Sequence, residues 1–126
     1  MDKLESAIRL AASLYDRLDR KDIAGIAALL GEDCRVETSA GASVSGIEAG
    51  LLHFQAFLAG HPGAKLGCEE LLGFGHRCVA RWKLNWVDES GREQCLRGMD
   101  VIREKDERIR EILSYVKVAE QDGSAG

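Results

Sequence analysis

The spacing of hydrophobic residues along this chain changes near its middle. Up to Pro62, apolar side chains recur every three or four residues, as on one face of an amphipathic helix. After Pro62 they tend to alternate with polar side chains, which is typical of half-buried β-strands. A group of helices followed by a group of strands predicts an α+β fold.

Three helices are predicted before Pro62. Residues 3–19 form the first, with charges on one face and an apolar face made of Leu4, Ala7, Ile8, Ala11, Leu14, Tyr15 and Leu18. Asp22 is a suitable N-cap for a short second helix, whose apolar face is Ile23, Ile26, Leu29 and Leu30. Gly31 is expected to end this helix.

A short strand and a third helix are predicted next. Residues 34–38 alternate and form the strand, and the following SAGASVSG has the composition of a loop. Ser45 and Glu48 have capping-box spacing, which predicts a helix that starts just after Ser45. Its apolar stripe is Ile47, Leu51, Phe54 and Leu58, and Gly60 and Pro62 end it.

Four strands are predicted for the rest of the chain, at residues 64–73, 76–88, 93–104 and 108–118. Short turns (GFGH, DESGRE and EKDER) join them, so neighbouring strands should pair antiparallel as a meander. The predicted fold is a cone, with three N-terminal helices packed on the concave face of a curved, mostly antiparallel sheet. Residues 1–118 are expected to form a single domain, and residues 119–126 a flexible, polar C-terminal tail.

Length and charge limit the classes of function. A chain of 126 residues fits one domain, and 45% hydrophobic with 30% charged residues is ordinary for a globular fold. The net charge is −4, and basic residues are interspersed with acidic ones. Nucleic-acid binding usually needs a basic face, so we expect no nucleic-acid partner.

The sequence also argues against membrane and metal sites. No stretch approaches the roughly 20 apolar residues that span a bilayer, and the N-terminus lacks the apolar core of a signal peptide. The three histidines show no HxH or HxxxH spacing, and the four cysteines form no CxxC pair. We expect a cytoplasmic protein with reduced thiols, no metal and no cofactor.

Asp100 is the main candidate functional residue. It lies between Met99 and Val101 in a predicted strand, where a carboxylate is costly unless it is solvated, paired or used. One interpretation is an acid/base group lining a pocket. The alternative is a structural carboxylate, paired with a neighbour such as Arg97 or solvated at a cavity mouth.

Three passages carry a resemblance to a known family. They are YDRLDRKDIAGIAALLGEDCRVE, VSGIEAGLLHFQAFLAGHP and CVARWKLNWVDESGREQCLRGMDVIREKDERIREILSYVK. In order and spacing the chain resembles, from about Leu4 to Lys117, the SnoaL-like branch of the nuclear transport factor two-like, ketosteroid-isomerase-like superfamily. That superfamily includes ketosteroid isomerases, polyketide cyclases, dehydratases, epoxide hydrolases and members that only bind or dimerise, so the fold alone does not fix the function.

The resemblance also implies roles for three residues. Ketosteroid isomerases keep a meander aspartate protonated so that it donates a hydrogen bond to the developing enolate, and the matching position is Asp100. Their general-base aspartate corresponds to Thr38, whose hydroxyl cannot remove a proton from carbon unaided. Tyr15 falls one residue from the oxyanion tyrosine. The cyclases are more similar, because a meander aspartate is their acid/base.

Other residues have structural interpretations that compete with functional ones. Tyr15 is either an oxyanion donor or a core aromatic with one hydrogen bond. His53 is either catalytic or a half-buried residue at a helix edge, and the structural role is favoured. Trp82 and Trp86 share one strand face and suit core or dimer packing better than ligand stacking. Of Glu69 and Glu70, one should point inward and one outward.

These observations leave two function classes open. The first is an enzyme, namely a cofactor-independent isomerase, cyclase or lyase acting on a small apolar carbonyl compound with Asp100, Tyr15 and Thr38. The second is a non-catalytic ligand-binding or dimerisation module. The predicted pocket residues are Leu14, Val36, Phe54, Leu58, Trp82, Ile102 and Tyr115. A homodimer is expected through the outer sheet face, because the strands carry apolar residues on both faces.

Overall fold

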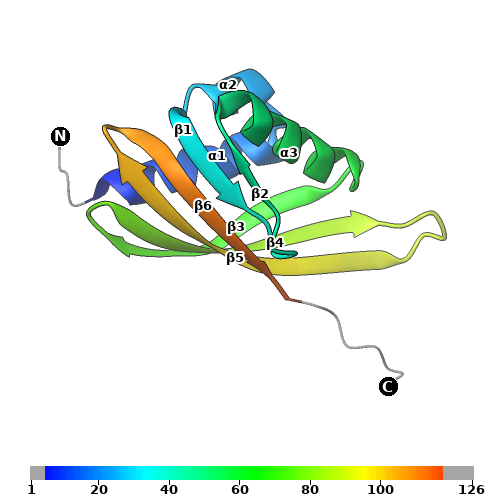
Figure 1. Ribbon diagram of the computed structural model, residues 1–126. Coiled ribbons are helices and arrows are strands. Elements are labelled where there is room, and N and C mark those ends of the chain that lie inside the picture. Colours follow the sequence, from blue (N-terminus) through cyan, green and yellow to red (C-terminus); the bar gives the residue numbers. More distant parts are fainter. Residues whose placement is uncertain (1–4, 118–126) are drawn as a thin grey trace.

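The computed structural model describes residues 5–117 of the chain, so the predicted tail at residues 119–126 lies outside the described residues. The helices are α1 (Ser6–Asp19), α2 (Ile23–Ala27) and α3 (Ile47–Ala59), and the strands are β1 (Leu30–Glu37), β2 (Ser43–Ser45), β3 (Lys65–Phe74), β4 (Arg77–Val87), β5 (Glu93–Lys105) and β6 (Arg108–Val116). The helices lie on one side of a single bent sheet (Figure 1). The predicted α+β fold, with three helices on a mostly antiparallel sheet, is confirmed.

The strand order in the sheet is β2-β1-β6-β5-β4-β3. Strands β3 to β6 form the predicted antiparallel meander, in which each strand pairs with the next. The N-terminal strand β1 pairs in parallel with β6 and antiparallel with β2. The first and last strands of the fold are therefore neighbours, which places β1 beside β6, the last strand of the meander.

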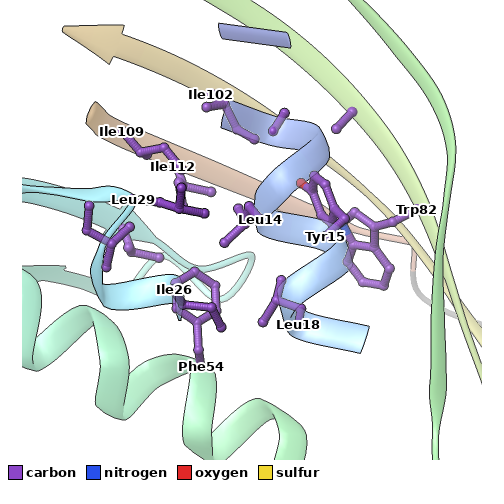
Figure 2. Close-up of a cluster of buried hydrophobic side chains, with 14 of the residues drawn as sticks. Leu14, Tyr15, Leu18, Ile26, Leu29, Phe54, Trp82, Ile102, Ile109 and Ile112 are labelled. Carbon is purple, nitrogen blue, oxygen red and sulfur yellow. The ribbon is translucent and has the colours of Figure 1, made fainter. Parts of the chain in front are cut away.

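Helix α1 provides most of the helical side of the core. Its apolar stripe is buried as the spacing predicts, at Ala7, Ala11, Leu14, Tyr15 and Leu18. Figure 2 shows Leu14 among Ile102, Ile109 and Ile112 of the sheet, and Tyr15 beside Trp82. One helical face therefore divides its contacts between an aliphatic cluster and an aromatic one.

The helix boundaries show one correct and one incorrect capping prediction. Asp22 caps α2 as expected, because its Oδ1 accepts a hydrogen bond from the Gly25 N–H at 2.9 Å. The capping box predicted at Ser45 and Glu48 is wrong, since Ser45 belongs to β2. The N-cap of α3 is Gly46, whose φ of 93° lies in the left-handed region that favours glycine.

Two more expectations about the N-terminal half need correction. The first strand starts at Leu30, so Gly31, predicted to end the preceding helix, lies inside β1. The segment predicted as a loop contains β2, which pairs with the end of β1 through Val36 and Val44. Short strands of three residues carry too little alternation to be recognised from the sequence.

No helix in the described part of the chain is long and apolar enough to cross a membrane.

Candidate functional site

A cavity of about 140 Å³ lies between the helices and the sheet. Helices α1 and α3, the turn after β1 and strands β3 to β6 all contribute to its wall. The lining residues are Tyr15, Leu18, Thr38, Ser39, His53, Phe54, Phe57, Leu66, Trp82, Asp100, Ser114 and Val116. The wall is therefore mainly apolar, with a few polar groups, as in many small-molecule sites.

Asp100 is buried in this wall, with 6% of its surface exposed. Tyr15 donates its hydroxyl hydrogen to Asp100 Oδ2, and Ser114 Oγ donates to Asp100 Oδ1 at 2.7 Å. Burial raises the pKa of Asp100, and hydrogen bonds from Tyr15, Ser114 and Trp82 oppose the rise without cancelling it. The site therefore favours the neutral carboxylic acid more than water does.

Tyr15 remains a hydrogen-bond donor in this environment. Burial, followed by the charge of Asp100, raises the pKa of the Tyr15 phenol well above its ordinary value. The hydroxyl is thus protonated across the physiological pH range. Tyr15 and Asp100 together give the cavity two adjacent O–H groups when Asp100 is neutral.

Glu104 provides an instructive contrast, since it is the other buried carboxylate among the described residues. Burial would raise its pKa, but hydrogen bonds from His76, from the Glu107 N–H and from Ser6 outweigh burial and lower it. As an ion, Glu104 ties the start of α1 at Ser6 to the turns at His76 and Glu107. Asp100, with a shift in the opposite direction, is not held as an ion in this way.

Strand pairing explains how Asp100 meets Ser114. Asp100 on β5 pairs with Ala80 of β4 and with Ser114 of β6, so their side chains point to the same face. Two residues along β5, Gly98 pairs with Trp82, and the Trp82 indole lies across the glycine. The ring can lie there because Gly98 has no side chain, and this places it beside Tyr15 (Figure 2).

The cavity brings together several of the residues named from the sequence. Asp100, Tyr15, Thr38, Phe54 and Trp82 all line it. Leu14, Val36 and Ile102, also predicted to line the pocket, are fully buried in the core instead. Leu58 packs against that core and does not line the cavity. Aliphatic side chains fill the space around Leu14, so the cavity is confined to the aromatic side of α1.

Tyr115 was predicted to line the pocket but lies on the opposite face of the sheet. It pairs with Met99 and is 53% exposed. The reason is a bulge: Glu104 pairs with Ile109 but Arg103 pairs with Glu111, so the register skips Arg110. A hairpin without this bulge would place Tyr115 opposite Gly98 on the cavity side, and Ser114 outside.

A second bulge explains why neither Glu69 nor Glu70 points inward. The register between β3 and β4 skips Glu69, and both glutamates are on the surface beside Arg81. Arg81 lies 2.9 Å from Glu70 and 3.9 Å from Glu69. The expected inward carboxylate at this pair is therefore wrong.

Sequence reasoning missed Ser114 and undervalued His53. Ser114 carries no sequence signal, because its position depends on the bulge at Arg110. His53 lines the cavity from α3 and is half-buried. Burial lowers the pKa of His53, although the charge of Asp100 opposes the shift. The only indication of His53 in the sequence was its position one residue before Phe54, next to the apolar stripe of the predicted helix.

The described residues contain no group of three or more His, Cys, Asp or Glu side chains that could hold a metal ion. The two buried cysteines are also poor nucleophiles. Burial, as the main cause, raises the pKa of Cys34 and Cys78 to about 11, which keeps both as thiols. The chemistry available in the cavity is that of Asp100, Tyr15, His53, Thr38, Ser39 and Ser114.

Comparison with models of protein families shows which family this chain belongs to. Residues 11–112 match the model of the SnoaL-like domain. The chain belongs to the SnoaL-like domain family. The matched region of this SnoaL-like domain contains Tyr15, Thr38, His53, Trp82 and Asp100, whereas Ser114 lies just beyond it. No functionally curated protein matches the chain in sequence.

Solved structures share the fold. A candidate ketosteroid isomerase from Kribbella flavida is 23% identical, with a TM-score of 0.80 over 94% of this chain and 83% of that one. An NTF2-like protein of unknown function from Mesorhizobium loti is 28% identical, with a TM-score of 0.77 over 94% and 96%. A candidate SnoaL-like polyketide cyclase from Jannaschia is 14% identical, with a TM-score of 0.82 over 93% and 89%. Since the first and third are under 25% identical, they establish the fold alone.

Proposed function

We propose that this SnoaL-like domain binds a small, mainly apolar carbonyl compound and catalyses proton transfer at the carbon next to the carbonyl. Such chemistry belongs to cofactor-independent isomerases, cyclases and lyases. The observation that carries the proposal is the buried Asp100, which shares hydrogen bonds with Tyr15 and Ser114 at the wall of an apolar cavity.

The geometry suits a carbonyl oxygen that gains negative charge. A neutral Asp100 has one O–H to donate, while its other oxygen still accepts from Tyr15 or Ser114. Donors fixed in a dry site stabilise a developing enolate more than water does. When the Asp100 proton is on Oδ2, Oδ1 still accepts from Ser114, and the Tyr15 O–H is released to turn toward the ligand as a second donor. The Thr38 hydroxyl at the cavity wall can orient the ligand.

A second candidate, a binding module without catalysis, is favoured by one observation. Both carboxylate oxygens of Asp100 already have partners within the protein. A polar group satisfied in this way can be purely structural. The two candidates differ in whether a bound carbonyl compound reacts.

The proposal is tested with cyclohexanone in D₂O, followed by NMR. We expect the protein to speed exchange of the hydrogens next to the carbonyl for deuterium. Phenol, which resembles the enol of cyclohexanone, should inhibit this exchange as it occupies the cavity. Binding is read independently from tryptophan fluorescence, because Trp82 lines the cavity. Binding of both compounds without faster exchange would favour the binding module.

We also propose that the protein forms a homodimer through the outer sheet face. Met99 and Tyr115 pair there, and they are 40% and 53% exposed. They line a groove together with Glu69, Arg81, Arg97 and Lys117. An apolar centre with both signs of charge at its edge suits contact with a second copy across a twofold axis.

A charge in this groove should dissociate the dimer. In Met99→Glu, two negative charges would face each other across the axis and lose their hydration on association. We therefore expect a monomer by sedimentation velocity at micromolar concentration. Val87→Glu is the matched control, since Val87 is an exposed strand residue outside the groove. A wild-type protein that sediments as a monomer at this concentration contradicts the proposal.

Location in the cytoplasm remains a proposal supported by the cysteines. All four are free thiols, two buried and two exposed. Reduced thiols persist in the reducing cytoplasm.

A further inference from the structure

The proposed reaction needs a group that accepts a proton from carbon. Of the side chains that line the cavity, only Tyr15, His53 and Asp100 titrate. Tyr15 is held as a protonated donor, and burial shifts Asp100 toward its neutral acid form. A protonated Tyr15 and a neutral Asp100 can stabilise an enolate by donating hydrogen bonds. In those protonation states, neither residue can accept a proton from carbon. Thr38, at the position of the family's general base, is a hydroxyl.

His53 differs from the other two histidines in its contacts. His61 Nδ1 contacts the Phe57 carbonyl oxygen at 3.1 Å, and His76 Nδ1 pairs with Glu104. No hydrogen bond or ion pair among residues 5–117 involves the His53 ring, which makes an edge contact with Phe54 at a centroid distance of 5.2 Å. His53 is half-buried at the cavity wall, and a polar ring withdrawn from water without a partner in the protein is available to a ligand.

The protonation state of His53 suits a base. Burial lowers its pKa, and the charge of Asp100 opposes the shift without reversing it. The imidazole is therefore neutral at pH 7, with a lone pair on one nitrogen. The titratable groups that share its cavity are Asp100 on β5 and Tyr15 on α1. His53 comes from α3, so the base and the acid stand on different elements.

We propose, on the basis of the proposed function, that His53 is the general base of this site and acts with Asp100 on carbonyl compounds with a single ring. His53 takes a proton from the carbon next to the carbonyl. The C–H electron pair forms a C=C bond, and the C=O π pair moves to oxygen, which receives the Asp100 proton. The products are an enol, an imidazolium and a carboxylate, and reversal returns a proton to carbon.

The cavity size defines the substrate class. Its volume of about 140 Å³ is close to the ~150 Å³ of an engineered cavity that binds benzene. One six-membered ring therefore fills it, and a fused polycyclic compound would extend past the exposed Ser39 into solvent. Cyclohexanone matches this volume of about 140 Å³ and has exchangeable hydrogens beside its carbonyl.

The test compares His53→Gln with His61→Gln in the cyclohexanone exchange assay. Glutamine keeps a polar side chain but cannot act as a base, so we expect exchange to fall by about 10²–10⁴-fold in His53→Gln. Quenching of the tryptophan fluorescence by the ligand, which Trp82 at the cavity wall reports, should be unchanged. His61→Gln, outside the cavity, should exchange at the wild-type rate.

The wild-type pH profile gives a second measurement that does not depend on a variant folding. Exchange should fall on the acidic side as His53 becomes protonated, with a midpoint below the ordinary histidine value of about 6.5. Full activity in His53→Gln, or no acidic limb, overturns the role of His53 and leaves the proposed function standing. A loss of ligand binding in His53→Gln also overturns it, since a packing role would explain that result. No exchange in the wild-type protein overturns both proposals.

Discussion

Replacing Asp100 by asparagine is expected to slow carbonyl proton exchange by about 10²–10⁴-fold while ligand binding persists. Asparagine keeps the shape of the side chain and can still accept from Tyr15 or Ser114. It has no acidic proton to give to the ligand oxygen. The rate is measured by exchange, and binding is measured by the change in tryptophan fluorescence. Asp16→Asn, on the exposed side of α1, is the matched control and should be fully active.

Asp100→Asn, although it slows exchange, should increase the stability of the protein at neutral pH. Burial raises the folded-state pKa of Asp100, so its stabilising contribution is complete below the unfolded-state value of about 4. That contribution is lost as the pH rises toward the folded-state pKa. Asparagine does not titrate, so the stability of Asp100→Asn relative to wild type should increase with pH above about 4. Urea unfolding at several pH values measures this difference.

Together the two measurements separate the functional and structural roles of Asp100. A slow but more stable variant at neutral pH indicates a residue kept for chemistry at the expense of stability. A variant with unchanged exchange and lower stability would show that Asp100 is a structural hydrogen-bond centre. In that case the binding module is the better description of the protein.

Residue patterns in the sequence were sufficient for the fold but only partly for the site. The change of spacing at Pro62 separates helices from strands, and the resemblance to SnoaL-like proteins placed Asp100 and Tyr15. Both residues depend on regular elements, namely the alternation of β5 and the stripe of α1. Regular elements fix which side chains share a face, so these positions could be predicted.

The errors arise where the register departs from regularity. The bulges at Glu69 and Arg110 each change which residues face the cavity, and no glycine or proline at either position indicates them. The β5–β6 turn adds to the difficulty. Its central residues, Asp106 and Glu107, have φ of 53° and 65°, which hairpin turns usually reach with Asn-Gly. The Glu107 N–H bonds to Glu104 Oε2 at 2.7 Å, a contact that only the folded structure reveals.

Gly98→Ala is expected to destabilise the protein by about 1–3 kcal/mol, because it overpacks the aromatic side of the core. A Cβ at Gly98 would lie 2.1, 2.5 and 2.7 Å from three atoms of the Trp82 indole. That ring is buried and makes an edge contact with Phe57 at a centroid distance of 5.9 Å, so it cannot swing aside freely. Since Trp82 lines the cavity, its displacement should also weaken ligand binding.

Gly67→Ala is the matched control for this prediction. Gly67 is also a strand glycine, on β3, and a Cβ there meets nothing within 4 Å. Urea unfolding should therefore show little change for Gly67→Ala and a clear loss for Gly98→Ala. Trp82→Phe should relieve the clash, so Gly98→Ala should cost less in the Trp82→Phe background than in wild type. Equal stability of the two alanine variants would mean that Trp82 does not rest on Gly98, and that another contact holds the indole beside Tyr15.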